Sequence, residues 1–152
     1  MANYTRIYLN GYSYFITVVT HQREPILVEN IDLLRQSFRE TKRYYKFSID
    51  AITVLPDHFH MIITPEDAKE YPRIIQSIKY NFTTRYQCRD QILQSMSRVK
   101  DKMQPVWQKR YYEHTIRNAK DWEEKMLYIR NNPVKHALVH RWIDWQYSSF
   151  QP

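Results

Sequence analysis

Hydrophobic and polar positions in the first third of the chain follow two different periods. Residues 14–20 (YFITVVT) are β-branched and aromatic almost throughout, which is typical of a strand. Pro25 ends this pattern, and Asn30 then stands where it can cap a helix. The apolar positions after it fit a 3.6-residue period, as in a helix: Ile31, Leu34, Phe38 and Tyr45. The period changes to two in the segment Phe47–Val54, which predicts a second strand with Phe47, Ile49 and Ala51 on one face.

The second strand is followed by a turn and a returning strand. Residues 55–57 (LPD) form the turn, and residues 58–64 predict a third strand that pairs with the second as an antiparallel hairpin. Pro65 ends this strand. A long helix is predicted from about Pro72. Its apolar side chains lie on one stripe along the helix, formed by Ile75, Ile78, Phe82 and Tyr86 (or Arg85).

The second half of the chain predicts one more strand and one more helix. Residues 88–104 are polar and indicate a loop over part of their length, and residues 106–116 indicate a fourth strand. Asn118 followed by Asp121 resembles a capping box, and Trp122, Met126 and Ile129 form the apolar stripe of the helix that it opens. We expect Pro133 to stop this helix.

The predicted order of elements is β-α-β-β-α-β-α. Its first six elements match the split βαβ, ferredoxin-like arrangement, in which two helices cover one face of an antiparallel sheet. The fold class is therefore predicted to be α+β, with an added C-terminal helix that can cover the other face. A length of 152 residues predicts a single domain, residues 1–152.

Composition excludes several classes of site. The chain has one glycine, Gly11, so it cannot form a phosphate-binding loop of the P-loop or dinucleotide type. The single cysteine, Cys88, excludes an internal disulfide framework and a zinc site built from several thiolates. No secretory signal and no apolar stretch of membrane-spanning length is visible, so we expect a cytoplasmic protein that does not contact a membrane.

Positive charge is concentrated in one part of the chain. The net charge is +7, and residues 73–117 contain ten basic and three acidic residues, which accounts for all of it. Together with 13 tyrosines and 4 tryptophans, this charge favours a nucleic-acid partner, although a solvated helix face explains the charge equally well. The candidate contacts to nucleic acid are Lys79, Arg85, Lys109 and Arg110.

The strand at residues 58–64 carries two histidines. Side chains alternate along a strand, so His58 and His60 point to one face while Phe59, Met61 and Ile63 point to the other. Two imidazoles at this spacing are a frequent pair of metal ligands. Taken alone, the pattern is a weak signal, and it more often reflects two structural or exposed histidines on a solvated sheet face.

The last helix carries a second candidate pair. Tyr128 lies off the apolar stripe, and Asn132 follows it by four residues on the same flank. A tyrosine can act as a covalent nucleophile, and an amide oxygen can bind a hard cation. The spacing alone also fits an interfacial tyrosine followed by an asparagine at the C-terminal end of the helix.

Four segments of this chain resemble the single-tyrosine HUH transposases, and in particular the REP-associated tyrosine transposases. They are residues 55–60 (LPDHFH), 106–114 (VWQKRYYEH), 128–136 (YIRNNPVKH) and 145–150 (WQYSSF). The segments occur in the family's order over nearly the whole chain. The chain departs from the family at Ala137, where glycine is frequent, and it lacks the longer C-terminal tail of some members.

The resemblance implies a function and a set of site residues. By this resemblance, His58, His60 and Asn132 bind a divalent metal, Mg²⁺ or Mn²⁺, and Tyr128 is the nucleophile that attacks single-stranded DNA. The product is a 5′-phosphotyrosine, from which a 3′-hydroxyl rejoins the strands. The expected partner is single-stranded DNA with a hairpin, as in repetitive palindromic elements, and the protein is expected to be a monomer or a homodimer.

Two other functions remain as alternatives. The chain could be a binding module for hairpin nucleic acid that has lost cleavage activity. It could also be a phosphodiesterase that uses a metal-bound water, in which case no covalent link between protein and DNA forms. Tyr128 and Asn132 at helical spacing, in the context of the resemblance, favour the transposase over both.

Overall fold

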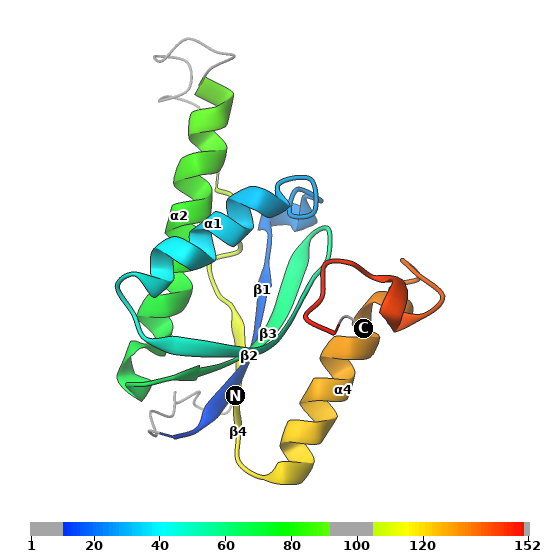
Figure 1. Cartoon of the computed structure of the whole chain (residues 1–152). Coiled ribbons are helices and arrows are strands. Elements are labelled where there is room, and N and C mark those ends of the chain that lie inside the picture. Colours follow the sequence, from blue (N-terminus) through cyan, green and yellow to red (C-terminus); the bar gives the residue numbers. More distant parts are fainter. Residues whose placement is uncertain (1–10, 92–104, 151–152) are drawn as a thin grey trace, which may run out of the picture.

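The elements of the chain follow the predicted order. A computed structural model describes residues 11–91 and 105–150 (Figure 1). Its strands and helices are β1 (Ser13–Val19), α1 (Ile31–Lys42), β2 (Phe47–Val54), β3 (His58–Pro65), α2 (Tyr71–Gln91), β4 (Tyr112–Ile116) and α4 (Ala119–Lys135). The α+β class and the β-α-β-β-α-β-α order are thus confirmed. In the described residues, no helix has the length and apolar character needed to cross a membrane.

The four strands form one antiparallel sheet in the order β2-β3-β1-β4. Helices α1 and α2 lie side by side on one face of the sheet, and α4 lies on the other (Figure 1). This is the ferredoxin-like arrangement with an added C-terminal helix. The two central strands, β3 and β1, therefore have both faces covered, and residues from these strands can serve two separate layers.

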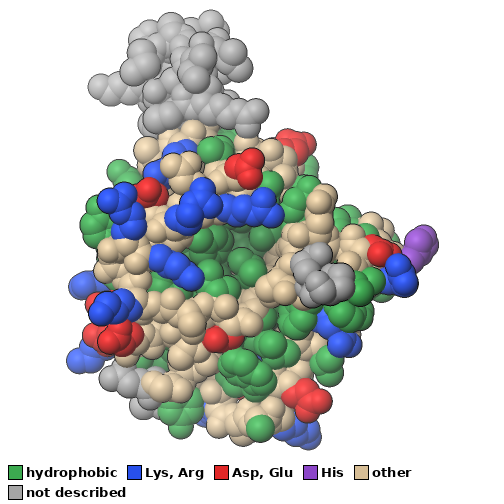
Figure 2. Space-filling view, viewed as in Figure 1, with side chains coloured by type: hydrophobic (Ala, Val, Ile, Leu, Met, Phe, Trp, Pro, Cys, Tyr) green, Lys and Arg blue, Asp and Glu red, His purple; other side chains and the backbone are tan. Residues whose placement is uncertain are grey.

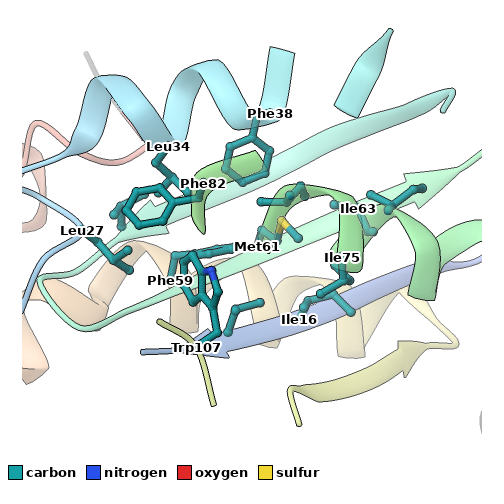
Figure 3. Packing of buried hydrophobic residues seen from close by; sticks show 14 of the residues in the cluster. Ile16, Leu27, Leu34, Phe38, Phe59, Met61, Ile63, Ile75, Phe82 and Trp107 are labelled. Atoms are coloured by element: carbon teal, nitrogen blue, oxygen red, sulfur yellow. The ribbon is translucent and has the colours of Figure 1, made fainter. Parts of the chain in front are cut away.

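The larger of the two hydrophobic clusters fills the layer between the sheet and α1 and α2 (Figure 3). Phe59, Met61 and Ile63 of β3 are fully buried in it, as the alternation along the strand predicts. A smaller cluster lies under α4, where Phe15, Ile62 and Ile129 are its buried members from β1, β3 and α4. The predicted stripe of α4 is confirmed, because Trp122 and Met126 pack against this second cluster.

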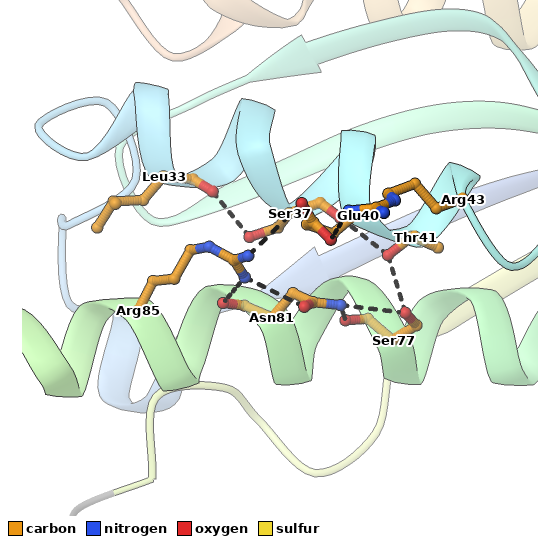
Figure 4. A network of polar contacts seen from close by, with 8 residues as sticks. All are labelled: Leu33, Ser37, Glu40, Thr41, Arg43, Ser77, Asn81 and Arg85. Atoms are coloured by element: carbon orange, nitrogen blue, oxygen red, sulfur yellow. Dashed lines mark hydrogen bonds and ion pairs between the residues drawn. The ribbon is translucent and has the colours of Figure 1, made fainter.

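Polar contacts join α1 to α2 above the larger cluster (Figure 4). The hydroxyls of Thr41 and Ser77 are hydrogen-bonded at 2.9 Å. Arg85 donates to the side chain and backbone of Asn81 and lies 3.9 Å from the Glu40 carboxylate. The Arg85 guanidinium, offered above as a nucleic-acid contact, is thus part of the interface between the two helices.

The alternation predicted for β2 is interrupted by a β-bulge. Ile49 pairs with Ile63, but Ala51 pairs with Ile62, so Asp50 is an extra residue on β2. The bulge moves Ala51 into the cluster under α4, away from the face that holds Phe47 and Ile49. The prediction that these three side chains share one face was therefore wrong.

Four predicted boundaries also differ from the structure. Residues 88–91 belong to α2 and not to a loop, while residues 92–104 lie outside the described part. Within 106–116, only Tyr112–Ile116 forms a strand, and Trp107 makes an isolated bridge to Thr20. Asn30 precedes α1 but its side chain donates to the Ile26 carbonyl and does not cap the helix, and Tyr45 lies beyond the end of α1.

Pro133 does not stop α4, which continues to Lys135. The missing N–H of Pro133 costs one hydrogen bond in the last turn, and the backbone N–H of His136 still donates to the Asn132 carbonyl. Ala137 then follows with φ +58°, in the left-handed region that favours glycine at the end of a helix. A glycine at this position would adopt the same conformation with less strain than Ala137.

Residues near the C-terminal end cover the outer edge of β2. The backbone N–H of Val54 donates to the Tyr147 carbonyl, and that of Ser149 donates to the Ile52 carbonyl, both at 2.8 Å. The Trp145 indole N–H also donates to the Val54 carbonyl. The segment therefore pairs with the part of β2 that lies beside the histidine-bearing end of β3.

Replacing Trp107 with alanine should destabilise the fold by about 3–5 kcal/mol. Its side chain is 7% exposed, its ring lies 5.3 Å from that of Phe82 and 6.0 Å from that of Phe59, and its N–H donates to the Lys79 carbonyl. Urea unfolding followed by circular dichroism measures the loss. Tyr44→Ala is the control, because Tyr44 is 77% exposed, and equal losses in the two variants would contradict this account of the core.

Candidate active site

His58 and His60 lie on the face of the sheet that α4 covers. Their neighbour Phe59 points into the opposite layer, so the predicted alternation is confirmed. Both histidines are buried, and the centroids of their rings are 4.8 Å apart. The β3 strand thus holds two imidazoles side by side between the sheet and α4.

Each of these imidazoles is held through its Nδ1 atom. Nδ1 of His58 donates to the carboxylate of Asp57 at 2.6 Å, and Nδ1 of His60 is hydrogen-bonded to the Thr17 hydroxyl at 2.7 Å. These contacts fix the orientation of both rings and leave Nε2 as the nitrogen that can bind a ligand. A second hydrogen bond of this kind is the usual way in which a metal-binding histidine is oriented.

Helix α4 places Tyr128 against the histidines of the same chain. The centroid of the Tyr128 ring is 5.2 Å from that of His60 and 5.7 Å from that of Phe15, both in edge-to-face geometry. The side chain is 39% exposed, so the ring is held by packing while solvent still reaches the residue. The two predicted site elements, the histidine strand and the tyrosine helix, are therefore brought together.

Asn132 lies one turn after Tyr128 and is 1% exposed. Neither its amide oxygen nor its amide nitrogen has a hydrogen-bond partner, and the same is true of Nε2 of His60. The amide is nevertheless close enough to raise the pKa of His60 slightly against larger opposing effects. Buried polar atoms without partners are costly in a folded protein, so these three atoms are available to bind a ligand. Asn132 is not a C-terminal cap, because α4 continues beyond it.

The donor atoms at this position fit a divalent metal ion. They are imidazole nitrogens from His58 and His60 and the amide oxygen of Asn132, which together leave coordination positions open. Across the described residues, no group of three His, Cys, Asp or Glu side chains is arranged to hold an ion, so a site at the two histidines would draw on the Asn132 amide. The His136 ring, 5.2 Å from that of His58, is an additional imidazole that the sequence did not single out.

A cavity of about 610 Å³ opens in front of these residues. Besides the histidines and Tyr128, its lining includes residues that the sequence did not assign to the site: Phe15, Thr17, Val19, Arg23, Tyr112, Glu124, Lys125, Lys135 and His136. One signal could have identified two of them, because Lys125 and Lys135 lie at helical spacing from Tyr128. Phe15, Thr17, Val19 and Tyr112 come from β1 and β4, and only the strand pairing brings them here.

Burial lowers the pKa of both histidines. For His60 the value falls to about 3, with desolvation as the main cause and electrostatic repulsion from His58, His136 and Lys135 as further causes. For His58, desolvation lowers the pKa although the Asp57 carboxylate acts in the opposite direction. Both imidazoles are therefore neutral at pH 7, which is the protonation state that binds a metal.

The lowered pKa of His60 predicts that the metal-free protein loses stability in acid. Below about pH 6.5 the unfolded chain binds a proton at His60 that the folded chain does not, so the free energy of unfolding falls as the pH drops from about 6.5 towards 3. His60 alone should contribute a loss of about 2 kcal/mol between pH 8 and pH 5. Urea unfolding in EDTA measures it.

Two histidine variants isolate this effect. His60→Gln should show a smaller acid loss than the wild type, whereas His140→Gln, at an exposed position, should show the same loss as the wild type. Equal pH dependence in His60→Gln and the wild type would contradict a neutral His60 in the folded state.

The predicted nucleic-acid contacts lie apart from the cavity lining. Lys79 and Arg85 are on α2, where Lys79 donates to the Gln108 carbonyl and burial lowers its pKa. Lys109 and Arg110 are exposed in the segment that precedes β4. Figure 2 shows further Lys and Arg side chains beside a hydrophobic hollow on the side of the molecule that carries α1. A cavity of about 340 Å³ lies there, between α1, β2 and residues 146–149. The role of the four predicted residues in nucleic-acid binding stays a prediction.

Comparison with known proteins gives consistent results over most of the chain. The profile of the family described as "Transposase IS200 like" matches residues 8–132. A REP-associated tyrosine transposase of Escherichia coli K12 is 35% identical over 99% of this chain and 83% of its own length. A Haemophilus influenzae protein provisionally assigned to the same group is 37% identical over 99% of this chain and 86% of its own length.

A solved structure is similar over the same extent. It is the structure of a REP-associated tyrosine transposase bound to a REP hairpin, with a TM-score of 0.82 and 33% sequence identity. The match covers 99% of this chain and 83% of the other. The similarity thus includes α4 and the segment after it as well as the sheet.

Proposed function

Because this chain belongs to the IS200-like transposase family and is a tyrosine transposase, we propose that it cleaves and rejoins single-stranded DNA next to a hairpin, with Tyr128 as the nucleophile. One observation carries the assignment of the site. The Tyr128 phenol lies in the same cavity as His58 and His60, beside the buried amide of Asn132 that has no hydrogen-bond partner.

The chemistry of Tyr128 is a transesterification. The phenol loses its proton to solvent, and its oxygen attacks the phosphorus of the scissile phosphodiester. A bond forms between phosphorus and the tyrosine oxygen, the bond from phosphorus to the 3′ oxygen breaks, and the 3′ oxygen takes up a proton to become a hydroxyl. The phosphate ester is conserved in the 5′-phosphotyrosine, so a 3′-hydroxyl can reverse the step without ATP.

We propose that His58, His60 and Asn132 hold a divalent metal, Mg²⁺ or Mn²⁺, in this cavity. Such an ion, when bound, neutralises charge on the scissile phosphate and on the leaving oxygen. The protein residues contribute the arrangement: Asp57 and Thr17 orient the two imidazoles, and α4 sets Asn132 one turn from Tyr128. The neutral imidazoles and the free amide oxygen support this proposal.

The proposed substrate is a strand with a hairpin of the repetitive palindromic type. Support comes from the solved relative that was determined with a REP hairpin and from the net charge of +7 on this chain. The positive charge favours a polyanion and makes binding sensitive to salt. A monomer suffices for the site as proposed, because Tyr128 lies against the histidines of its own chain.

A test for a covalent adduct decides between this function and its alternatives. Wild-type protein is incubated with Mn²⁺ or Mg²⁺ and a panel of labelled hairpin oligonucleotides from the genome next to the gene, then run on a denaturing gel. We expect a protein-linked band that retains the 5′ end of the downstream fragment. Cleavage without an adduct would indicate a water nucleophile, and binding without cleavage would indicate a binding module.

Replacing Asp57 with asparagine should weaken metal binding by about 10- to 100-fold. The change removes a charged acceptor from Nδ1 of His58, so the ring is less firmly oriented and its Nε2 is less basic. Isothermal titration of the protein with MnCl₂ measures the affinity. Asp32→Asn, at an exposed carboxylate on α1, is the matched control, and equal affinities in the two variants would contradict the role of Asp57.

A further inference from the structure

Four polar side chains form a single stripe on α4, and three of them, Lys125, Tyr128 and Lys135, line the cavity. Lys125, Tyr128, Asn132 and Lys135 follow one another at intervals of three, four and three residues, which places them on one face of the helix. We name these four residues the α4 stripe. Its two inner members are the proposed nucleophile and the proposed metal ligand, and its two ends are lysines.

Both lysines are directed to the cavity. Nζ of Lys135 lies 5.1 Å from the centroid of the Tyr128 ring, and Nζ of Lys125 lies 6.0 Å from the centroid of the Phe15 ring on the floor of the same cavity. In the described part of the chain, Lys135 has no carboxylate within ion-pair distance. Its charge is therefore free to meet an anion beside the phenol.

Lys125 is held in place by a polar chain from the neighbouring strand. Its Nζ lies 3.2 Å from one oxygen of Asp121, and the other oxygen of Asp121 lies 2.7 Å from Nε2 of His114 on β4. The Asp121 carboxylate thus fixes Lys125 to the end of α4 next to β4. The cavity lining also includes the carboxylate of Glu124 and the positive side chains of Arg23 and Lys135. Positive side chains therefore outnumber carboxylates in the lining.

The geometry points to a path for the cleaved strand, and this inference rests on the proposed function. We propose that Lys125 and Lys135 bind the phosphates on either side of the scissile one, so that the strand runs along α4. Their separation of ten positions along the sequence corresponds to about 15 Å of helix, with Tyr128 between the two charges. An extended single strand covers this distance within a few nucleotides.

A neighbouring cavity extends this path beyond Lys135. It has a volume of about 580 Å³ and shares Lys135 with the site, while Trp142 and Ile143 give it apolar walls. The Arg130 guanidinium lies 4.9 Å from the centroid of the Trp142 ring and supports it. The nucleotide base next to the phosphate bound by Lys135 can therefore lie against an apolar surface, which is a favourable environment for an unpaired base.

Neutral linkages in the DNA test which phosphate each lysine binds. Oligonucleotides of the cleaved hairpin are made with one methylphosphonate, either 5′ or 3′ of the scissile linkage, and their Kd is measured by fluorescence anisotropy. All proteins carry Tyr128→Phe, so that binding is measured without cleavage. Each methylphosphonate should weaken binding to the parent by about tenfold, since it removes one charged contact.

The lysine variants should each become insensitive to one linkage. Lys135→Met should bind the unmodified DNA about tenfold more weakly and lose no further affinity with one of the two methylphosphonates, while the other still costs about tenfold. Lys125→Met should show the opposite pattern. Each variant should also reduce the slope of log affinity against log salt by about 0.7. Lys120→Met, at an exposed position of α4 outside the stripe, should match the parent.

The outcomes separate this inference from the proposed function. If both methylphosphonates cost the same in the parent and in both lysine variants, the path along α4 is wrong, even when the wild type forms the covalent adduct. If the wild type cleaves the DNA without forming an adduct but the pattern of insensitivity is present, the path holds and the nucleophile assignment fails. Lys135→Arg should restore most of the affinity and the sensitivity, which a loss of folding could not explain.

Discussion

Tyr128→Phe should abolish the covalent link between protein and DNA. Loss of the proposed nucleophilic oxygen is expected to reduce adduct formation by roughly 10⁴-fold or more, as removal of a catalytic nucleophile does in other enzymes. The ring itself stays, so its contacts with His60 and Phe15 remain, and the stability should change by no more than about 0.5 kcal/mol. Affinity for the hairpin should be nearly unchanged. A denaturing gel and a binding titration measure the two effects.

Tyr112 provides the matched control for this variant. It is the other tyrosine in the lining of the cavity, and at 58% exposure its hydroxyl is open to solvent. Tyr112→Phe should keep the adduct, and mass spectrometry of the wild-type adduct should place the nucleotide on Tyr128. An adduct that survives in Tyr128→Phe and disappears in Tyr112→Phe would move the nucleophile from α4 to β4. Cleavage that continues in Tyr128→Phe without any adduct would favour a water nucleophile.

Removal of the two histidines proposed to bind the metal should have the second largest effect. His58→Ala, His60→Ala and treatment of the wild type with EDTA should each lower the rate of adduct formation on the order of 10²–10³-fold, which corresponds to several kcal/mol of transition-state stabilisation. Addition of excess Mn²⁺ should restore the chelated wild type but not the variants. Rates are taken from gels at a series of Mn²⁺ concentrations.

Folding has to be checked separately, because both histidines are buried. Urea unfolding of each variant in EDTA shows whether the sheet is intact, and His140→Ala controls for the loss of a histidine elsewhere. Mn²⁺ should raise the unfolding midpoint of the wild type and of His140→Ala, because a ligand that binds only the folded state stabilises it. A cleavage rate that does not respond to EDTA would overturn the assignment of His58, His60 and Asn132 as metal ligands.

The spacing of apolar residues predicted those strands and helices in which each side chain faces either the core or solvent. The β-branched residues of Phe47–Val54 and the apolar stripe of α4 were found where the sequence placed them. The bulge at Asp50 was not, because it depends on how β2 pairs with β3 and not on the residues of β2 alone. In the same way, Pro133 is accommodated because α4 ends only two residues later.

The same distinction, between spacing within one element and pairing between elements, separates the site residues that the sequence predicted from those that it missed. The histidine pair and the pair formed by Tyr128 and Asn132 could be recognised because each lies within one element, where the spacing fixes the relative direction of the side chains. Thr17 and Tyr112 reach the cavity from β1 and β4, and no spacing within the chain relates those strands to β3. Asp57 could have been proposed from its position next to His58, since a carboxylate beside a ligand histidine commonly orients it.

The segment that pairs with β2 has a consequence for aggregation. An uncovered edge strand exposes a row of backbone donors and acceptors to which another chain can add a strand. Here the Val54 N–H and the Ile52 carbonyl are already bonded to Tyr147 and Ser149 of the same chain. Copies of this protein are thereby protected from joining their sheets edge to edge through β2.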